Sequence, residues 1–173
     1  MPIAESMLAE FEGEAIITRK FLERVPADKL GWTPHERSMT MGQLAFHIAA
    51  LPGGVIQLAT TERASIPQFG AAPQPESLEQ ILDTLESSIV TVRSILGTLD
   101  DARMREIWSA SKDGKELFAV PRVGFMRSVL LNHWYQHRGQ LSVYLRLLDV
   151  SVPSSYGPSA DELPDFLLKA QSA

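Results

Sequence analysis

The sequence of 173 residues contains no cysteine. A disulfide framework, a thiolate nucleophile and a cysteine-bound zinc site are therefore excluded. Any metal ion must be bound by histidine, aspartate or glutamate side chains.

Positive charge is also scarce, because 16 Lys and Arg stand against 21 Asp and Glu, for a net charge of −5. Nucleic acids and anionic membranes bind proteins through a positive field, so neither is an expected partner. The N-terminal residues lack the basic head and apolar stretch of a signal peptide. The most apolar stretch, residues 44–59, is shorter than the roughly 18–20 residues of a membrane span. We therefore expect a cytoplasmic protein.

The length predicts one domain spanning residues 1–173, because domains average roughly 150 residues. Helical periodicity, with apolar residues at steps of three and four, covers four segments. They are about Ile3–Val25, Thr40–Glu62, Pro75–Leu99 and Pro121–Asp149. Helices this long extend roughly 30–44 Å at 1.5 Å per residue, which favours an all-α four-helix bundle.

Several boundaries carry specific signals. Thr40 and Gln43 match a capping box at the start of the second helix, and residues 65–76 have the composition of a surface loop. The long connection at 100–120 contains the turn signal Lys112–Lys115, which short strands could flank. Ser159–Glu162 could cap a short C-terminal helix.

The main functional signal comes from the four histidines, His35, His47, His133 and His137. His133 and His137 are four residues apart, so both imidazoles leave one helix face a turn apart. Both lie on the apolar stripe of the fourth helix, and His47 lies on that of the second. Rings so placed can converge on one ion.

A structural interpretation competes with the metal site. A buried histidine is usually hydrogen-bonded to a carbonyl or a water molecule. Two imidazoles in an apolar core need partners, or each costs about 1–3 kcal/mol. Spacing alone leaves the two interpretations equally favoured. His35 lies in a loop-like segment and is expected to be solvated or locally hydrogen-bonded.

Several motifs are shared with a known family. They are Trp32–Pro34 before a capped helix, Met41–Leu44 leading to His47, the string His133–Leu141 (HWYQHRGQL), and Tyr156–Glu162 near the C-terminus. On these motifs the sequence resembles the DinB family along nearly its whole length, with the string His133–Leu141 as the specific part.

The resemblance implies a four-helix bundle with a long connection between the third and fourth helices and a short C-terminal helix. It also implies a homodimer and a divalent metal ion bound by His47, His133 and His137. Family members resemble transferases that use low-molecular-weight thiols. Off the inner stripe of the first helix, Ile16 and Ile17 offer one dimer surface.

Three histidines leave a metal ion positively charged and open to a further ligand. Such an ion can activate water or stabilise the thiolate of a substrate. We therefore expect a small-molecule thiol and an electrophile as partners. Zinc is the first expectation for the metal because it is redox-inert and abundant, and imidazole also suits nickel and iron.

No general acid or base stands out near the histidines. Gln140, Trp134 and Tyr144 are candidates for the substrate pocket, and Arg138 is expected on the outer face of its helix. Two alternatives stay open: a metal-dependent hydrolase, which lacks an obvious carboxylate base, and a non-catalytic metal-binding stress-response protein.

Overall fold

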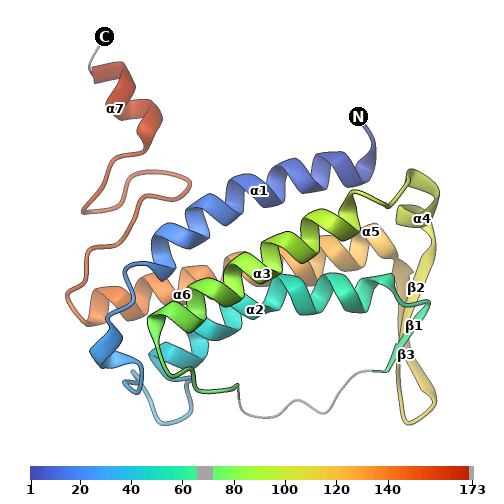
Figure 1. The fold of residues 1–173 in the computed structure, drawn as a ribbon, viewed down its shortest axis with the longest axis horizontal. Helices are drawn as coiled ribbons and strands as arrows, with labels where there is room; N and C mark the ends of the chain where they lie inside the picture. Colours follow the sequence, from blue (N-terminus) through green and yellow to red (C-terminus); the bar gives the residue numbers. More distant parts are fainter. Residues whose placement is uncertain (66–71, 172–173) are drawn as a thin grey trace.

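The computed structural model describes residues 1–65 and 72–171. Four long helices lie side by side (Figure 1): α1 (Ile3–Leu22), α2 (Met41–Thr60), α3 (Leu78–Leu96) and α6 (His133–Leu147). Helix α3 packs against α1 and α2, and α6 packs against both of these from the other side. The four helices enclose one apolar core.

Helix α2 begins where the sequence predicts. The backbone N–H of Gln43 donates to Thr40 Oγ1 at 3.1 Å, and the N–H of Thr40 donates to Gln43 Oε1 at 3.0 Å. This reciprocal capping box satisfies two N–H groups that a helix start leaves without intrahelical partners.

Helix α2 is long and apolar enough to cross a membrane by length and composition alone, but 56% of its apolar window is buried inside the protein. The core helix of a bundle has the same composition, so the burial accounts for its apolar character.

The prediction of an all-α chain is wrong in one respect, because the mostly helical fold carries a three-stranded sheet in the order β1–β2–β3. Strands β2 (Ile107–Lys112) and β3 (Lys115–Pro121) form the antiparallel hairpin that the turn signal indicated. Asp113 and Gly114 both have positive φ, as a tight two-residue turn requires. Strand β1 (Arg63–Ser65) pairs in parallel with β2.

The expected continuous helix at Pro121–Asp149 is divided. It comprises α5 (Arg122–Phe125), a π-helical segment (Met126–Asn132) and α6. Shorter elements are a 3₁₀ turn at Ala27–Lys29 and α4 at Asp101–Arg105.

The C-terminal helix α7 (Asp165–Gln171) begins later than its predicted cap. Ser159 Oγ does accept the N–H groups of Asp161 and Glu162, but in a turn that no helix follows directly. Half of the predicted loop at 65–76, residues 66–71, lies outside the described residues.

Buried Arg122, the first residue after β3, holds two helices together. Its guanidinium donates to the carbonyls of Ala59, Thr61 and Arg103 and forms an ion pair with Glu106 at 3.4 Å. The last carbonyls of a helix lack intrahelical donors, so this arginine holds the C-terminal end of α2 against α4.

Candidate metal centre

The structure brings His47, His133 and His137 together in a half-buried cluster between α2 and α6. One ring nitrogen from each histidine lies within 4.8 Å of the other two. The ring of His47 stands nearly perpendicular to that of His137, with centroids 4.6 Å apart. His35 lies elsewhere, in an exposed turn, where its Nδ1 accepts the backbone N–H of Arg37.

A proline in α2 explains how α6 is docked beside His47. Pro52 has no N–H, so the carbonyl of Ile48 lacks its usual donor one turn later. The fully buried indole of Trp134 supplies the missing donor, with Nε1 at 2.8 Å from that carbonyl. Since Ile48 follows His47 and Trp134 follows His133, this hydrogen bond sets the two histidine-bearing turns side by side.

The π-helical segment leads directly into the site. It ends at Asn132, and His133 opens the regular helix α6. A π-helical segment is rare, and such segments are frequent at functional sites. It leaves His133 hydrogen-bonded to the backbone of Val129.

Hydrogen bonds set the protonation pattern of His137. Its Nδ1 lies 2.7 Å from Gln140 Oε1, and an amide oxygen can only accept, so Nδ1 carries the hydrogen. In the neutral ring Nε2 then has a free lone pair, and it points at His133 Nε2, 2.7 Å away. Such an outer hydrogen bond orients a metal-binding histidine and selects its tautomer.

Burial favours the neutral form of His47 and His133. It lowers the pKa of His47 to about 4, and the nearby His137 and His133 lower it further. Burial and then His137 also lower the pKa of His133, against the hydrogen bond to Val129, which raises it. Neutral imidazoles are the form that binds a metal ion.

The donor set fits a divalent metal ion. Two nitrogens on one tetrahedral ion are about 3.3 Å apart when each bond is about 2.0–2.1 Å, so small ring movements suffice. Within residues 1–65 and 72–171, no aspartate or glutamate joins the cluster. The protein thus offers three nitrogen donors and no described fourth ligand.

The three pocket candidates occupy different positions. Gln140 is exposed at the site, where it contacts His137. Trp134 belongs to the core, stacked on Phe11 with ring centroids 5.1 Å apart. Tyr144 is half-buried, and its hydroxyl donates to the carbonyl of Met39.

Arg138 was expected on the outer face of its helix, and this expectation is wrong, because its side chain is only 3% exposed. Helix α6 is buried on two sides, one facing α2 and the other facing α1 and the C-terminal segment. The buried residues of α6 are Trp134, His137, Arg138, Leu141 and Leu145.

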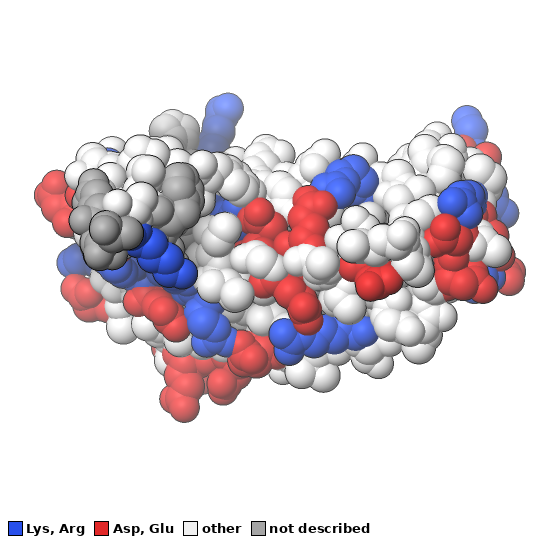
Figure 2. All heavy atoms as spheres, turned by 90° about the horizontal axis from the view of Figure 1, so that it is seen from above, with Lys and Arg blue, Asp and Glu red and all other residues white. Residues whose placement is uncertain are grey.

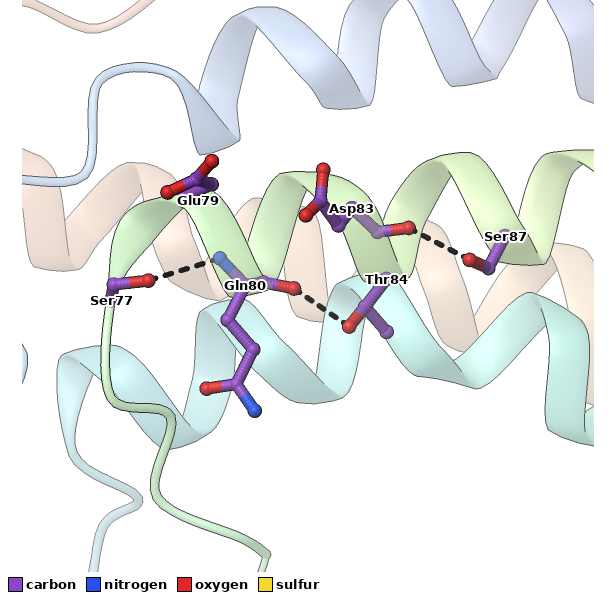
Figure 3. Close-up of a pocket in the computed structure, with 6 residues that line it drawn as sticks. All are labelled: Ser77, Glu79, Gln80, Asp83, Thr84 and Ser87. Carbon is purple, nitrogen blue, oxygen red and sulfur yellow. Dashed lines mark hydrogen bonds between the residues drawn. The ribbon is translucent and has the colours of Figure 1, made fainter.

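A surface depression on the outer side of α3 contains none of the histidines (Figure 3). It is lined by Ser77, Glu79, Gln80, Asp83, Thr84 and Ser87. The Thr84 and Ser87 hydroxyls donate to carbonyls one turn earlier in the same helix, and Ser77 caps it. These hydroxyls serve the helix itself, so the depression adds nothing to the metal centre.

Comparison with known proteins identifies the family. The DinB family profile matches residues 1–165. The chain belongs to the DinB family. This DinB-family chain is 27% identical over 167 residues to the uncharacterized protein YrdA of Bacillus subtilis strain 168, covering 96% of this chain and 95% of YrdA.

Two solved structures share the fold of this DinB-family protein. A DinB-like protein from Bacillus cereus aligns with a TM-score of 0.66 and 22% identity, over 88% of this chain and 97% of that one. The DinB-like protein YjoA from Bacillus subtilis gives the same TM-score at 17% identity, over 86% and 96%. At these identities the likeness establishes the fold alone.

Proposed function

We propose that this DinB-family protein binds one divalent metal ion through His47, His133 and His137 and transfers a low-molecular-weight thiol to an electrophile. The observation that carries the proposal is the meeting of three imidazoles with no described carboxylate among them. Zinc is the first candidate, with nickel and iron as alternatives, since imidazole suits all three.

The donor set favours an open site over a closed structural one. Structural zinc sites usually have four protein ligands, whereas catalytic sites keep a position for water or substrate. Three histidines without a described fourth ligand match the second type.

A bound dication would supply the positive charge that favours a thiolate over a thiol. The chain has no cysteine, so the sulfur nucleophile must come from a co-substrate. In the transfer, the thiol loses its proton to solvent and a sulfur–carbon bond forms at the electrophile; in a substitution the bond to the leaving group breaks and its electron pair departs with that group, and in an addition a carbon–carbon double bond opens and takes up a proton from solvent. Gln140 contributes by holding the proton of His137 at Nδ1, which keeps the Nε2 lone pair directed at the centre.

Two other functions receive less support. Hydrolysis usually employs a general base to take a proton from water, and no described acidic side chain joins the histidines. A purely structural metal ion in a non-catalytic stress-response protein would call for a closed shell, and the described part of the chain shows three donors only.

The first test measures metal content and coordination in protein prepared without nickel chromatography. We expect about one metal ion per chain in wild type and in His35→Ala, and loss of the metal in His137→Ala. Equal metal content in the two variants would contradict the site.

The second test follows thiol consumption with a panel of thiols and electrophiles, with metal-loaded wild type and His137→Ala side by side. Metal-dependent consumption by wild type alone supports the transferase. If the metal binds but no thiol is consumed across the panel, the non-catalytic alternative replaces it.

A further inference from the structure

The helical stretch formed by α5, the π-helical segment and α6 contains one residue more than a regular helix would need. Phe125 and Met126 are buried, and the next buried pair is Leu130 and Leu131, each five residues further on. An α-helix has 3.6 residues per turn, so its buried residues follow at steps of three and four. A step of five therefore places an extra residue in this turn, within the π-helical segment Met126–Asn132.

The backbone of His133 shows the effect of the extra residue. Its N–H donates to the carbonyl of Ser128, five residues earlier. In an α-helix the same N–H would donate to the carbonyl of Val129, four residues earlier. The Val129 carbonyl therefore lacks the backbone donor that a regular helix would give it, and a half-buried carbonyl of this kind needs another partner.

The imidazole of His133 is that partner. The ring is hydrogen-bonded to the backbone of Val129, and a carbonyl oxygen can only accept, so the ring nitrogen that faces it carries the hydrogen. His133 Nε2 lies 2.7 Å from His137 Nε2, so the nitrogen that faces Val129 is Nδ1, the one nearer the helix backbone. A neutral imidazole has a single N–H, which leaves Nε2 of His133 as the nitrogen available to a metal ion.

We infer that the extra residue of Met126–Asn132 serves the metal centre, because it frees the Val129 carbonyl to hold the hydrogen of His133 on Nδ1. The two histidines of α6 then have matching outer partners, a main-chain carbonyl for His133 and the side chain of Gln140 for His137. Such partners orient ligating rings and select their tautomer. Val129 is thus a positioning residue that acts through its main chain, and the inference rests on the metal site of the proposed function.

Both ends of the stretch are fixed to the rest of the protein. Before the segment, the ring of Phe125 stacks on that of Trp108 with centroids 3.8 Å apart. After it, the Trp134 indole donates to the carbonyl of Ile48 at 2.8 Å. These contacts set the direction of the helix on each side, and a π-helical turn takes up the extra residue between them. Removal of one residue should therefore give a regular helix with both ends in place.

The outer side of the segment does not need the extra residue. Arg127 pairs there with Glu10 at 2.6 Å, and both side chains are partly exposed. Figure 2, which views the α1 side, shows acidic and basic groups next to one another along the surface. Exposed ion pairs contribute little to folding, and Ser128 is itself exposed. Ser128 can therefore be removed without the loss of a buried side chain.

Deletion of Ser128 tests the inference. In the shortened helix the N–H of His133 bonds to the Val129 carbonyl, which displaces the imidazole. We expect the helical circular dichroism of wild type and a zinc affinity about 10- to 100-fold lower, as for loss of an outer partner. The matched control is Ser128→Ala, which keeps the extra residue and should bind zinc as wild type does in isothermal titration.

The outcomes separate this inference from the proposed function. Equal zinc affinity in wild type and the deletion variant overturns the inference and leaves the metal site in place. A wild type that binds no zinc overturns both, and a loss of affinity in Ser128→Ala equal to that in the deletion variant shows that the extra residue is not the cause.

NMR of the zinc-loaded wild type gives a second readout, which applies even if the deletion variant does not fold. The Nδ1 hydrogen of His133 should exchange with solvent at least about tenfold more slowly than the ring hydrogen of exposed His35, because a hydrogen-bonded N–H must open before it exchanges. Exchange as fast as that of His35, or zinc bound to Nδ1 of His133, contradicts the inference.

Discussion

His137 and Arg138 are neighbours in the sequence, and both are buried, at 9% and 3% exposure. Their side chains leave α6 about 100° apart around its axis, and they have different roles. His137 faces α2, where it meets two other imidazoles and the exposed Gln140. Arg138 faces α1, where it is surrounded by groups that satisfy its charge.

The partners of Arg138 form a complete network. Its guanidinium pairs with the Glu14 carboxylate at 2.5 Å and donates to Thr18 Oγ1 at 3.0 Å and to the Tyr156 hydroxyl at 2.6 Å. It also lies over the rings of Tyr135 and Tyr156, 5.4 and 5.3 Å from their centroids. The network joins α1, α6 and the C-terminal segment.

The difference lies in whether the protein itself completes the coordination of a buried polar group. Around Arg138 it does, so the arginine stabilises the fold. Around the histidines it brings three ring nitrogens within 4.8 Å of one another with no described carboxylate among them, as expected where an external ligand binds. Five predictions sharpen this contrast, from the largest expected effect to the smallest.

Arg138→Met should lower the free energy of unfolding by about 3–5 kcal/mol, because it leaves the Glu14 carboxylate buried without its cation. Urea denaturation measures the loss. Glu14→Gln/Arg138→Met removes both charges and should recover much of it. As a control, Arg127→Ala breaks the exposed pair with Glu10, which should cost less than about 1 kcal/mol. Equal losses in Arg138→Met and Arg127→Ala would remove the contrast.

His137→Ala should behave in the opposite way. Metal affinity should fall by more than the roughly 10- to 100-fold that loss of an outer partner causes, because a direct ligand is lost. The metal-free variant should stay folded, since no structural network depends on this ring. Isothermal titration with zinc measures the metal affinity, and thermal unfolding in chelator measures the stability of the metal-free protein. If the metal-free variant is unfolded, His137 serves the fold as Arg138 does, and the contrast between them is wrong.

Trp134→Phe should cost about 1–3 kcal/mol, because the carbonyl of Ile48 is left buried without a donor. Adding Pro52→Ala supplies a backbone N–H to that carbonyl within α2. We therefore expect the double variant to lose less stability than the sum of the two single variants, as measured in urea. Strict additivity would show that the indole N–H and the proline are not coupled.

Gln140→Ala should weaken zinc binding by about 10- to 100-fold, because His137 loses the partner that selects its tautomer. Gln140→Glu, which also accepts the Nδ1 hydrogen, should bind zinc more tightly than the alanine variant. Stability should hardly change, since Gln140 is exposed. The prediction fails if alanine and glutamate variants bind zinc alike.

The metal-free protein should lose stability as the pH falls from about 6.5 toward about 4. The folded state lowers the pKa of His47, so the unfolded chain binds more protons in this range and acid favours unfolding. Above the unfolded pKa this contribution is fully present. His47→Gln should flatten the dependence in denaturation at several pH values, and an unchanged slope would refute the assignment.

Several features of the fold and of the site could be predicted from the sequence, because they depend on local geometry. The spacing of His133 and His137 places both rings on one helix face in any α-helix. The Thr40–Gln43 capping box and the Asp113–Gly114 turn are equally local, and the structure contains both. Their outcome does not depend on which segments pack together.

Other features depend on distant partners and left no local signal. Strand β1 has three residues and pairs with a strand more than 40 positions away. The π-helical segment interrupts a pattern that reads as one helix. In the sequence Arg138 cannot be distinguished from a solvated arginine. Its burial depends on Glu14 of α1 and Tyr156 of the C-terminal segment, which are its partners in the folded protein.

By itself the sequence determined three of the long helices, the capping box of α2 and the placement of two histidines on one helix face, because each follows from the repeat of the α-helix and from contacts within a turn or two. Only the tertiary structure decided that His47 lies beside His133 and His137 and that Arg138 is buried. It also decided that the Trp134 indole donates to the Ile48 carbonyl, which lacks a donor because of Pro52. These outcomes depend on how α1, α2 and α6 pack, and packing energy is summed over residues far apart in the chain.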